Sequence, residues 1–184
     1  AAIHRYRHPE TASPRFFAEI TPRPFQQRIL EALEAARQGG MSRNLVVAAT
    51  GTGKTIIAAL DYRAQLGTQE IPPSLLFVVH RKEILQQALD CFRAVLRDQN
   101  FGELLVDGQQ PGQWRHVFAS VQSLNRQRPW HQLGAGHFAH VVVDEAHHGT
   151  ASSYRPLFDI LQPKILLGLT ATPERMDGSS ILPD

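Results

Sequence analysis

Cysteine is nearly absent from this chain, which contains one, Cys91, among 184 residues. A single thiol cannot form an internal disulfide or a thiolate metal site, so the sequence favours a reducing, cytoplasmic setting over a disulfide-stapled secreted domain. The chain also lacks any apolar run near the roughly 20 residues of a membrane span, and its first ten residues lack the apolar core of a signal peptide. We therefore expect a soluble protein without a membrane partner.

Zinc-like spacing is missing among the nine histidines, although His147 and His148 are adjacent. A metal site built by histidine is therefore not expected. The net charge of +2 and the sequence pI near 9.0 tolerate a polyanionic partner without requiring one. With 42% hydrophobic and 20% charged residues, the composition is that of one globular domain.

Short apolar runs alternate with longer helical patterns along most of the chain. Residues 1–20 show no clear period, and we interpret them as a linker or the tail of an upstream region; a helix is then predicted from Pro24, with Gly39 where it stops. Five apolar runs are predicted as buried strands: 45–49, 75–80, 116–120, 141–145 and 165–169. The helices between them predict a three-layer α/β/α domain over 21–184, whose mainly parallel sheet binds ligands at the carboxyl ends of its strands.

The strongest motif, AATGTGKT, lies between the first of these strands and the next helix. It is a phosphate-binding loop in which Ala48 replaces the first glycine of the general pattern. Glycines let backbone N–H groups converge on phosphate oxygens, Lys54 reaches the terminal phosphates, and the Thr55 hydroxyl can bind Mg²⁺. The predicted nucleotide-binding residues are Thr50, Gly51, Thr52, Gly53, Lys54 and Thr55. An empty glycine-rich turn is the weaker alternative, because strand, loop and helix follow in the required order.

Two adjacent carboxylates end the apolar run at 141–145. Asp144 can hold Mg²⁺, and Glu145 can orient or deprotonate the attacking water in phosphoryl transfer. Taken alone, the pair is equally typical of a strand that ends in solvent, but beside the phosphate loop it favours the catalytic interpretation. We therefore predict ATP and Mg²⁺ as cofactors, with Lys54, Asp144 and Glu145 as catalytic residues.

The phosphate loop, the sequence DEAH at 144–147 and the segment Thr170-Ala171-Thr172 together resemble the first motor domain of superfamily 2 helicases. The extended DEAHH and the segment LGLTATPERMDG look most like the motor subunits of type I and type III restriction enzymes and related bacterial helicases. The resemblance covers residues 21 to about 178. It implies a RecA-like fold and ATP hydrolysis coupled to work on nucleic acid.

The same resemblance implies further residues at the nucleotide. RPFQ at 23–26 is similar to the family's glutamine motif, which implies that Arg23 and Gln26 lie at the nucleotide and that Gln26 reads the adenine edge. The neighbouring Gln27 is the alternative. The resemblance also implies a group that couples the nucleotide site to the rest of the motor: His147, counted with the catalytic residues, Thr170 and Thr172.

Two other segments, VVHRKEILQQ and FASVQSL, resemble motifs that contact the nucleic-acid backbone. Without the family, polar residues after a strand are usually solvated loop residues. The resemblance implies contacts from Arg81, Ser120, Gln122 and Ser123, with DNA favoured over RNA. The basic turn at 126–128 is a weak candidate, whereas Trp114 and Trp130 are expected to pack rather than to stack on bases.

Members of this family hydrolyse ATP between two RecA-like domains, and the motifs of the second domain do not occur in this sequence. An arginine finger from such a domain typically contributes about 10³ to 10⁵ in rate, so we expect the chain to bind Mg-ATP with little turnover. We interpret it as part of a longer protein that holds the second motor domain. A nuclease or modification domain or subunit is a further candidate partner.

The leading hypothesis is therefore the ATP-binding domain of a nucleic-acid-dependent ATPase, a helicase or duplex DNA translocase of restriction or repair type. The alternative is an ATP-dependent conformational switch that does not translocate, because both use the same loop. A small-molecule kinase is disfavoured, since no acceptor-site signal is present and it would leave the DEAH and Thr170-Ala171-Thr172 motifs unexplained.

Overall fold

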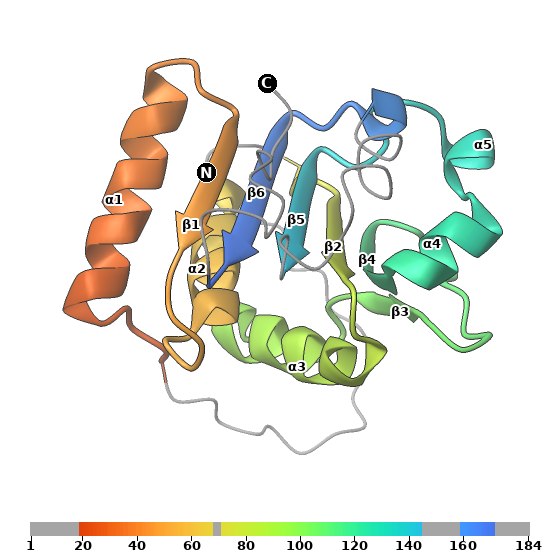
Figure 1. The fold of residues 1–184 in the computed structure, drawn as a ribbon, viewed down its shortest axis with the longest axis horizontal. Coiled ribbons are helices and arrows are strands. Elements are labelled where there is room, and N and C mark those ends of the chain that lie inside the picture. The colour runs from red at the N-terminus through yellow and green to blue at the C-terminus, as the bar shows by residue number, and fades with distance from the viewer. Residues whose placement is uncertain (1–18, 68–70, 145–158, 172–184) are drawn as a thin grey trace, which may run out of the picture.

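The computed structural model describes residues 19–67, 71–144 and 159–171. Within these ranges six strands form one all-parallel sheet with helices on both faces (Figure 1). The predicted α/β/α class is therefore confirmed. None of the helices in these ranges is long and apolar enough to cross a membrane.

The strands follow the order β1-β6-β5-β2-β4-β3 across the sheet. Their bounds are β1 (Arg43–Val47), β2 (Leu75–Val79), β3 (Glu103–Leu105), β4 (His116–Ser120), β5 (His140–Asp144) and β6 (Ile165–Thr170). Val47 is in register with Thr170, and Asp144 with Leu169, so β1, β6 and β5 end together at one edge. That edge is where an α/β sheet binds its ligands.

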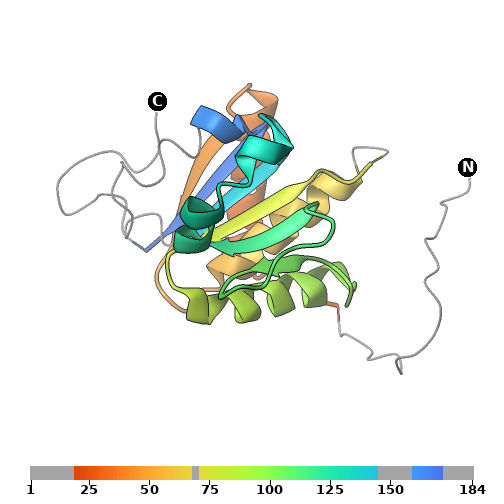
Figure 2. The same cartoon turned by 90° about the vertical axis from the view of Figure 1, so that its right-hand side faces the viewer.

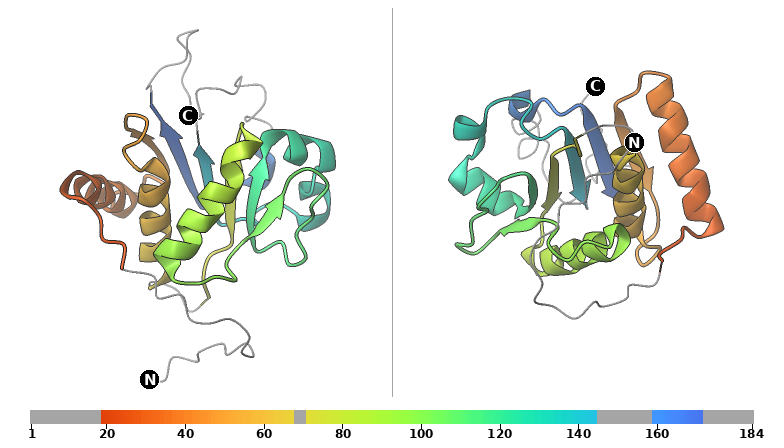
Figure 3. Two further views of the ribbon diagram at one scale, coloured as in Figure 1. Left: turned by 90° about the horizontal axis from the view of Figure 1, so that it is seen from below. Right: turned by 180° about the vertical axis from the view of Figure 1, so that it is seen from behind.

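Helices cover both faces of the sheet, as the side views show (Figures 2 and 3). Their bounds are α1 (Pro24–Gln38), α2 (Lys54–Leu66), the 3₁₀ turn η1 (Lys82–Ile84), α3 (Leu85–Leu96), α4 (Val121–Gln127) and α5 (Trp130–Leu133). One apolar core contains residues of α1, α2 and α3, and a second one contains residues of α4. The two cores lie on opposite faces because alternate strand residues point to opposite sides.

Burial explains why the strands lie where the apolar runs predicted them. All five residues of β2 are buried, and the ring of Phe77 stacks against Phe118 of β4 with centroids 5.3 Å apart. Burial of one such side chain stabilises the fold by about 1.5–3 kcal/mol. Tyr62 is also fully buried, and its hydroxyl donates a 2.6 Å hydrogen bond to the carbonyl of Pro73.

Several elements differ from the sequence prediction, most of them by one residue. β1 begins and ends two residues before the predicted 45–49. Past its end, the carbonyls of Ala48 and Ala49 accept hydrogen bonds from Lys54 Nζ. The start of the third helix is a 3₁₀ turn. β3 was not predicted, since three residues at the sheet edge, of which only Leu105 is buried, are too short to give an apolar run. Most of the helical pattern at 152–161 lies outside the described residues.

Candidate nucleotide-binding site

The phosphate loop forms a tight turn between β1 and α2. Gly51 and Gly53 both have φ = +82°, the left-handed region that favours glycine. Thr52 closes the turn by donating both its backbone N–H, at 3.3 Å, and its hydroxyl, at 2.6 Å, to the carbonyl of Ala49. The backbone therefore adopts the predicted loop immediately before the N-terminus of α2.

Lys54 is the first residue of α2, and its side chain folds back over the loop. Its Nζ donates hydrogen bonds to the carbonyls of Ala48 at 3.1 Å and Ala49 at 3.4 Å. The ammonium group thus lies within reach of the loop that would cradle a phosphate, and Thr55 follows it in the first turn. A loop with glycines at positive φ, a lysine over it and a helix N-terminus behind it fits a polyphosphate group.

Gln26, near the start of α1, lies against the same loop and is 3% exposed. Its Oε1 accepts the backbone N–H of Arg23 at 2.9 Å, and its Nε2 donates to the carbonyl of Thr52 at 3.1 Å. An amide has two donors and two acceptor lone pairs, so one of each remains for an adenine edge. Gln27 instead is exposed and donates to Glu31 along the helix. The geometry therefore favours Gln26 over Gln27 as the glutamine at the nucleotide.

Asp144 ends β5 at the edge where the loop lies, and it is 7% exposed. Between β5 and β1 runs β6, whose last residue, Thr170, is fully buried and accepts the backbone N–H of Ala48 at 2.9 Å. The loop, Asp144 and Thr170 are thus brought to one edge. Thr55 and Asp144 are the described residues that can hold a Mg²⁺ ion, and no group of three His, Cys, Asp or Glu side chains suited to a metal exists in the described ranges.

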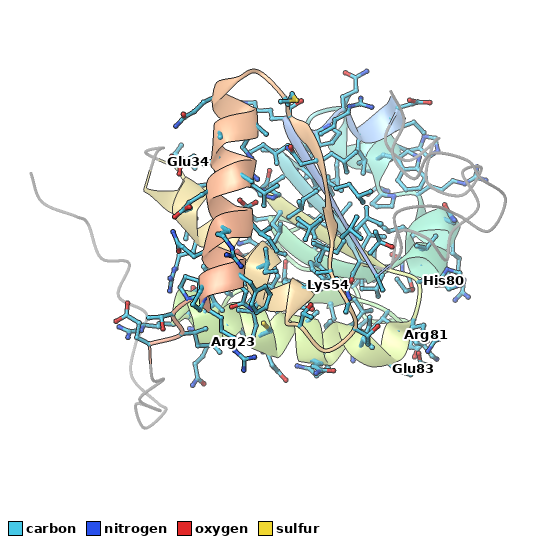
Figure 4. The ribbon with its side chains drawn as sticks, turned by 60° about the vertical axis from the view of Figure 1, so that its left-hand side comes forward. Arg23, Glu34, Lys54, His80, Arg81 and Glu83 are labelled. Atoms are coloured by element: carbon cyan, nitrogen blue, oxygen red, sulfur yellow. The ribbon has the colours of Figure 1, made fainter. Side chains whose placement is uncertain are left out.

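Several predicted site residues cannot be placed. Glu145, His147 and Thr172 lie outside the described residues, so their predicted roles stay predictions. In Figure 4, Lys54 lies between Arg23, near the lower end of α1, and Arg81 on the right of the view. Glu34 lies toward the other end of α1 in the same view.

The predicted nucleic-acid residues line a cleft of about 400 Å³ between η1 and α4. We call it the cationic cleft; its lining residues are His80, Arg81, Lys82, Glu83, Asp107, Ser120, Gln122, Ser123 and Arg126. The structure thus brings together all four predicted contacts. It adds Lys82, which pairs with Asp107 at 2.8 Å on an exposed surface, and Arg126 of the basic turn.

Ser120 and Ser123 are buried rather than exposed within this cleft. The Ser120 oxygen accepts the backbone N–H of Ser123 at 3.1 Å and so caps α4, while the two hydroxyl oxygens lie 2.9 Å apart in a hydrogen bond. Their visible role is this cap, and their contact with nucleic acid stays a prediction. Arg81 and Gln122 are exposed at the cleft.

The sequence analysis did not predict a buried polar group between α1, α2 and β5. The Arg37 guanidinium donates to both carboxylate oxygens of Asp61, at 2.7 and 2.5 Å, and His140 lies 3.8 Å from the same carboxylate. Burial raises the pKa of Asp61, against the opposing effect of Arg37, and burial together with Arg37 lowers the pKa of His140 to about 3. The sequence did hold a signal for this group, because Asp61 is the one charged residue in the otherwise apolar pattern TIIAALDY.

Fold and loop together define the class: a RecA-like, P-loop nucleotide-binding domain. Among solved structures, the UvsW helicase of bacteriophage T4 superposes with a TM-score of 0.71 at 21% identity, over 88% of this chain and 56% of that one. The type ISP restriction-modification enzyme LlaGI superposes with a TM-score of 0.69 at 19% identity, over 90% of this chain and 19% of that one. At these identities the likeness establishes the fold.

The family follows from the sequence comparison. The model of the family "Type III restriction enzyme, res subunit" matches residues 19–175, so the chain belongs to this family. It is 30% identical to the helicase-family protein IRC3 of Saccharomyces cerevisiae over 173 residues, 86% of this chain and 24% of that protein. It is also 30% identical to the EcoAI type I restriction endonuclease subunit of Escherichia coli over 166 residues, 84% and 20% of the two chains. The chain thus spans about a quarter of these relatives' length, and the resemblance to restriction-type helicase domains is confirmed.

Proposed function

We propose that this chain binds Mg-ATP and is the first motor domain of a cytoplasmic, DNA-directed helicase or translocase. One observation carries the proposal: the phosphate loop with Lys54 and the strand that ends in Asp144 meet at one edge of the sheet. The relatives support nucleotide use, since they include a helicase-family protein and a restriction enzyme subunit.

Each residue of the candidate site, including those outside the described ranges, has a defined task in this proposal. The loop N–H groups and the N-terminus of α2 bind the phosphates, and Lys54 neutralises the terminal one. Thr55 and Asp144 would hold Mg²⁺, and the ion would neutralise phosphate charge. Gln26 reads the adenine edge with the donor and acceptor that its contacts with Arg23 and Thr52 leave over. Glu145 orients the attacking water, and His147 couples this step to Thr170 and Thr172.

In this proposal the nucleic acid binds in the cationic cleft. Arg81 and Arg126 are its two arginines, and the exposed Gln122 amide is a third group for the backbone of a nucleic acid. DNA is favoured over RNA because the relatives named above include a restriction enzyme subunit, and LlaGI was solved with a DNA substrate mimic. A second RecA-like domain completes the ATP cleft in our proposal, with a nuclease or modification unit as a further partner.

The first test is the steady-state ATPase rate of the native-length protein with duplex DNA, single-stranded DNA and RNA. Lys54→Ala is the blank, because it removes the ammonium from the loop and should abolish nucleotide binding. Glu145→Gln should retain nucleotide binding and lose turnover. Duplex DNA is expected to stimulate the parent most, and the stimulation should fall as salt rises because phosphate contacts release counterions.

Other outcomes would point elsewhere. ATP binding without stimulation by any nucleic acid would favour a conformational switch and reject the motor. Turnover by Glu145→Gln at the parent's rate would reject the role of that carboxylate. Binding of ATP by Lys54→Ala at the parent's affinity would reject the nucleotide site itself.

A further inference from the structure

The buried pair of Arg37 and Asp61 joins two helices that both reach the nucleotide site. Arg37 comes from the last turn of α1 and Asp61 from the middle of α2, with side chains 13% and 3% exposed. The contact is bidentate, which fixes the angle between the partners as well as their separation. Buried ion pairs often add little net stability, because desolvation offsets the attraction. Net stabilisation therefore does not account for this pair.

His140 extends this pair to the sheet. It is the first residue of β5, it is fully buried, and its Nε2 lies 3.8 Å from Asp61 Oδ2. Neither ring nitrogen has a hydrogen-bond partner among the described residues, and the ring packs edge-on against Tyr62 with centroids 5.6 Å apart. Buried polar atoms without partners are disfavoured, so an apolar side chain would serve packing better at this position.

The three elements joined by this group each carry one part of the candidate ATP site. α1 begins next to Gln26, α2 begins with Lys54, and β5 ends with Asp144. From the rise per residue, the buried group lies about 16 Å from Gln26 along α1, about 10 Å from Lys54 along α2 and about 13 Å from Asp144 along β5. The helices run toward the buried group from the site, and the strand runs from it to the site.

We propose that Arg37, Asp61 and His140 form a positioning group that sets how α1, α2 and β5 lie relative to one another, and thereby aligns Gln26, Lys54 and Asp144 for ATP. The inference rests on the proposed function of that site. Arg37 and Asp61 act through rigid elements and touch no nucleotide, so they are positioning residues. Rotation or sliding of α1 would move Gln26 off the loop carbonyl of Thr52, its contact at 3.1 Å.

The test separates positioning from stability. Arg37→Met combined with Asp61→Leu replaces both charges by apolar side chains of similar reach, so the protein should fold with an unchanged or higher urea midpoint. Its affinity for Mg-ATP should nevertheless fall by about tenfold, because a site held loosely by its supporting residues loses precise geometry. Its preference for ATP over GTP should fall as well, and Gln26→Ala added to the double variant should cause little further loss.

A matched control lies on the same helix. Arg63 of α2 donates to the carbonyl of Val95 at 3.3 Å, toward α3 rather than α1, so Arg63→Met should keep both the affinity and the preference. Calorimetric titration with ATP and GTP in the presence of Mg²⁺, and urea unfolding of every variant, give the readouts. If the double variant binds ATP and prefers it as the parent does, the inference is wrong while the proposed function stands. If the parent binds no ATP, or Lys54→Ala binds it equally, the proposed function fails first.

Discussion

Gly53 shows how one residue position links α1 to the phosphate loop. Its φ of +82° disfavours any side chain, and a Cβ built there would lie 2.9 Å from Gln26 Nε2. Gly40 has a similar φ of +87°, but no atom lies within 4 Å of a Cβ built on it. The two glycines thus share the backbone constraint and differ in what surrounds them.

We expect Gly53→Ala to lower ATP affinity by at least about tenfold, because the methyl group pushes Gln26 away and strains the loop that binds phosphate. Gly40→Ala carries a comparable backbone strain of about 1 kcal/mol or more at a distance from the loop, so it should lower stability and leave ATP affinity unchanged. Titration calorimetry with Mg-ATP and urea unfolding measure the two quantities. Equal ATP affinities for both variants would contradict the assignment of the loop.

At the scale of elements, α4 presents one basic side chain, Arg126, to the cationic cleft. Arg126 lines the cleft, whereas Arg128, two residues on, ends the helix with φ = +45° and is not among the lining residues. Both side chains are exposed. They form a natural pair for comparison, because they share charge, size and neighbourhood but differ in position relative to the cleft.

Replacing Arg126 by Ala should weaken binding to duplex DNA and reduce the slope of log affinity against log salt concentration by about one, as expected when one phosphate contact is lost. Arg128→Ala should change the slope much less. Fluorescence anisotropy with a labelled duplex at four or five salt concentrations gives both slopes. Identical slopes for the two variants would mean that the cleft does not carry the DNA backbone.

Local patterns made part of this architecture predictable. The phosphate loop, the helix from Pro24 and the apolar strands follow from residues close together in the sequence, and their bounds were found within two or three residues. β3 was not predicted because it is a strand only through its pairing with β4 at the sheet edge, and no local pattern in the sequence indicates that pairing. Glu103 in this strand accepts backbone N–H groups from Gly112, Gln113 and Trp114, a loop contact that no periodicity indicates.

The site was predictable to the same extent. The chemistry of Lys54 and Asp144 was visible because a glycine-rich turn and a carboxylate after an apolar strand are local signals. The contact of Gln26 with Thr52 and the pairing of Arg37 with Asp61 were not, because each joins residues more than 20 positions apart. Only the packing of α1 on α2 brings such partners together.

For the whole molecule, the buried His140 makes stability depend on pH. His140 faces Arg37, Asp61 and Tyr62, and burial followed by the charge of Arg37 lowers its pKa to about 3. An ordinary histidine has a pKa of about 6.5. Below that pH, His140 therefore binds a proton in the unfolded chain but not in the folded chain. The part of the folding stability that depends on neutral His140 is fully present above pH 6.5 and is lost as the pH drops toward 3. The raised pKa of Asp61 acts in the opposite direction.

We expect the free energy of unfolding to drop by about 2 kcal/mol between pH 7 and pH 5 on account of His140, from the difference in proton binding between the two states. His140→Phe should remove this part of the loss, because phenylalanine fills the same space and does not titrate. Urea unfolding at the two pH values measures both proteins. An equal loss for parent and variant would show that another group controls the acid sensitivity.

The sheet order also determines when the nucleotide site can form during synthesis. β1 has β6 as its strand neighbour in the described sheet, and the loop residue Ala48 donates to Thr170 at the end of that strand. A nascent chain therefore carries β1 and its loop unpaired until β6 leaves the ribosome, although β2, β4 and β5 can already assemble. The emerging chain therefore gains nucleotide binding only after β6 has paired with β1. A chain cut before residue 165 would keep every residue of the loop and lose the strand that holds it.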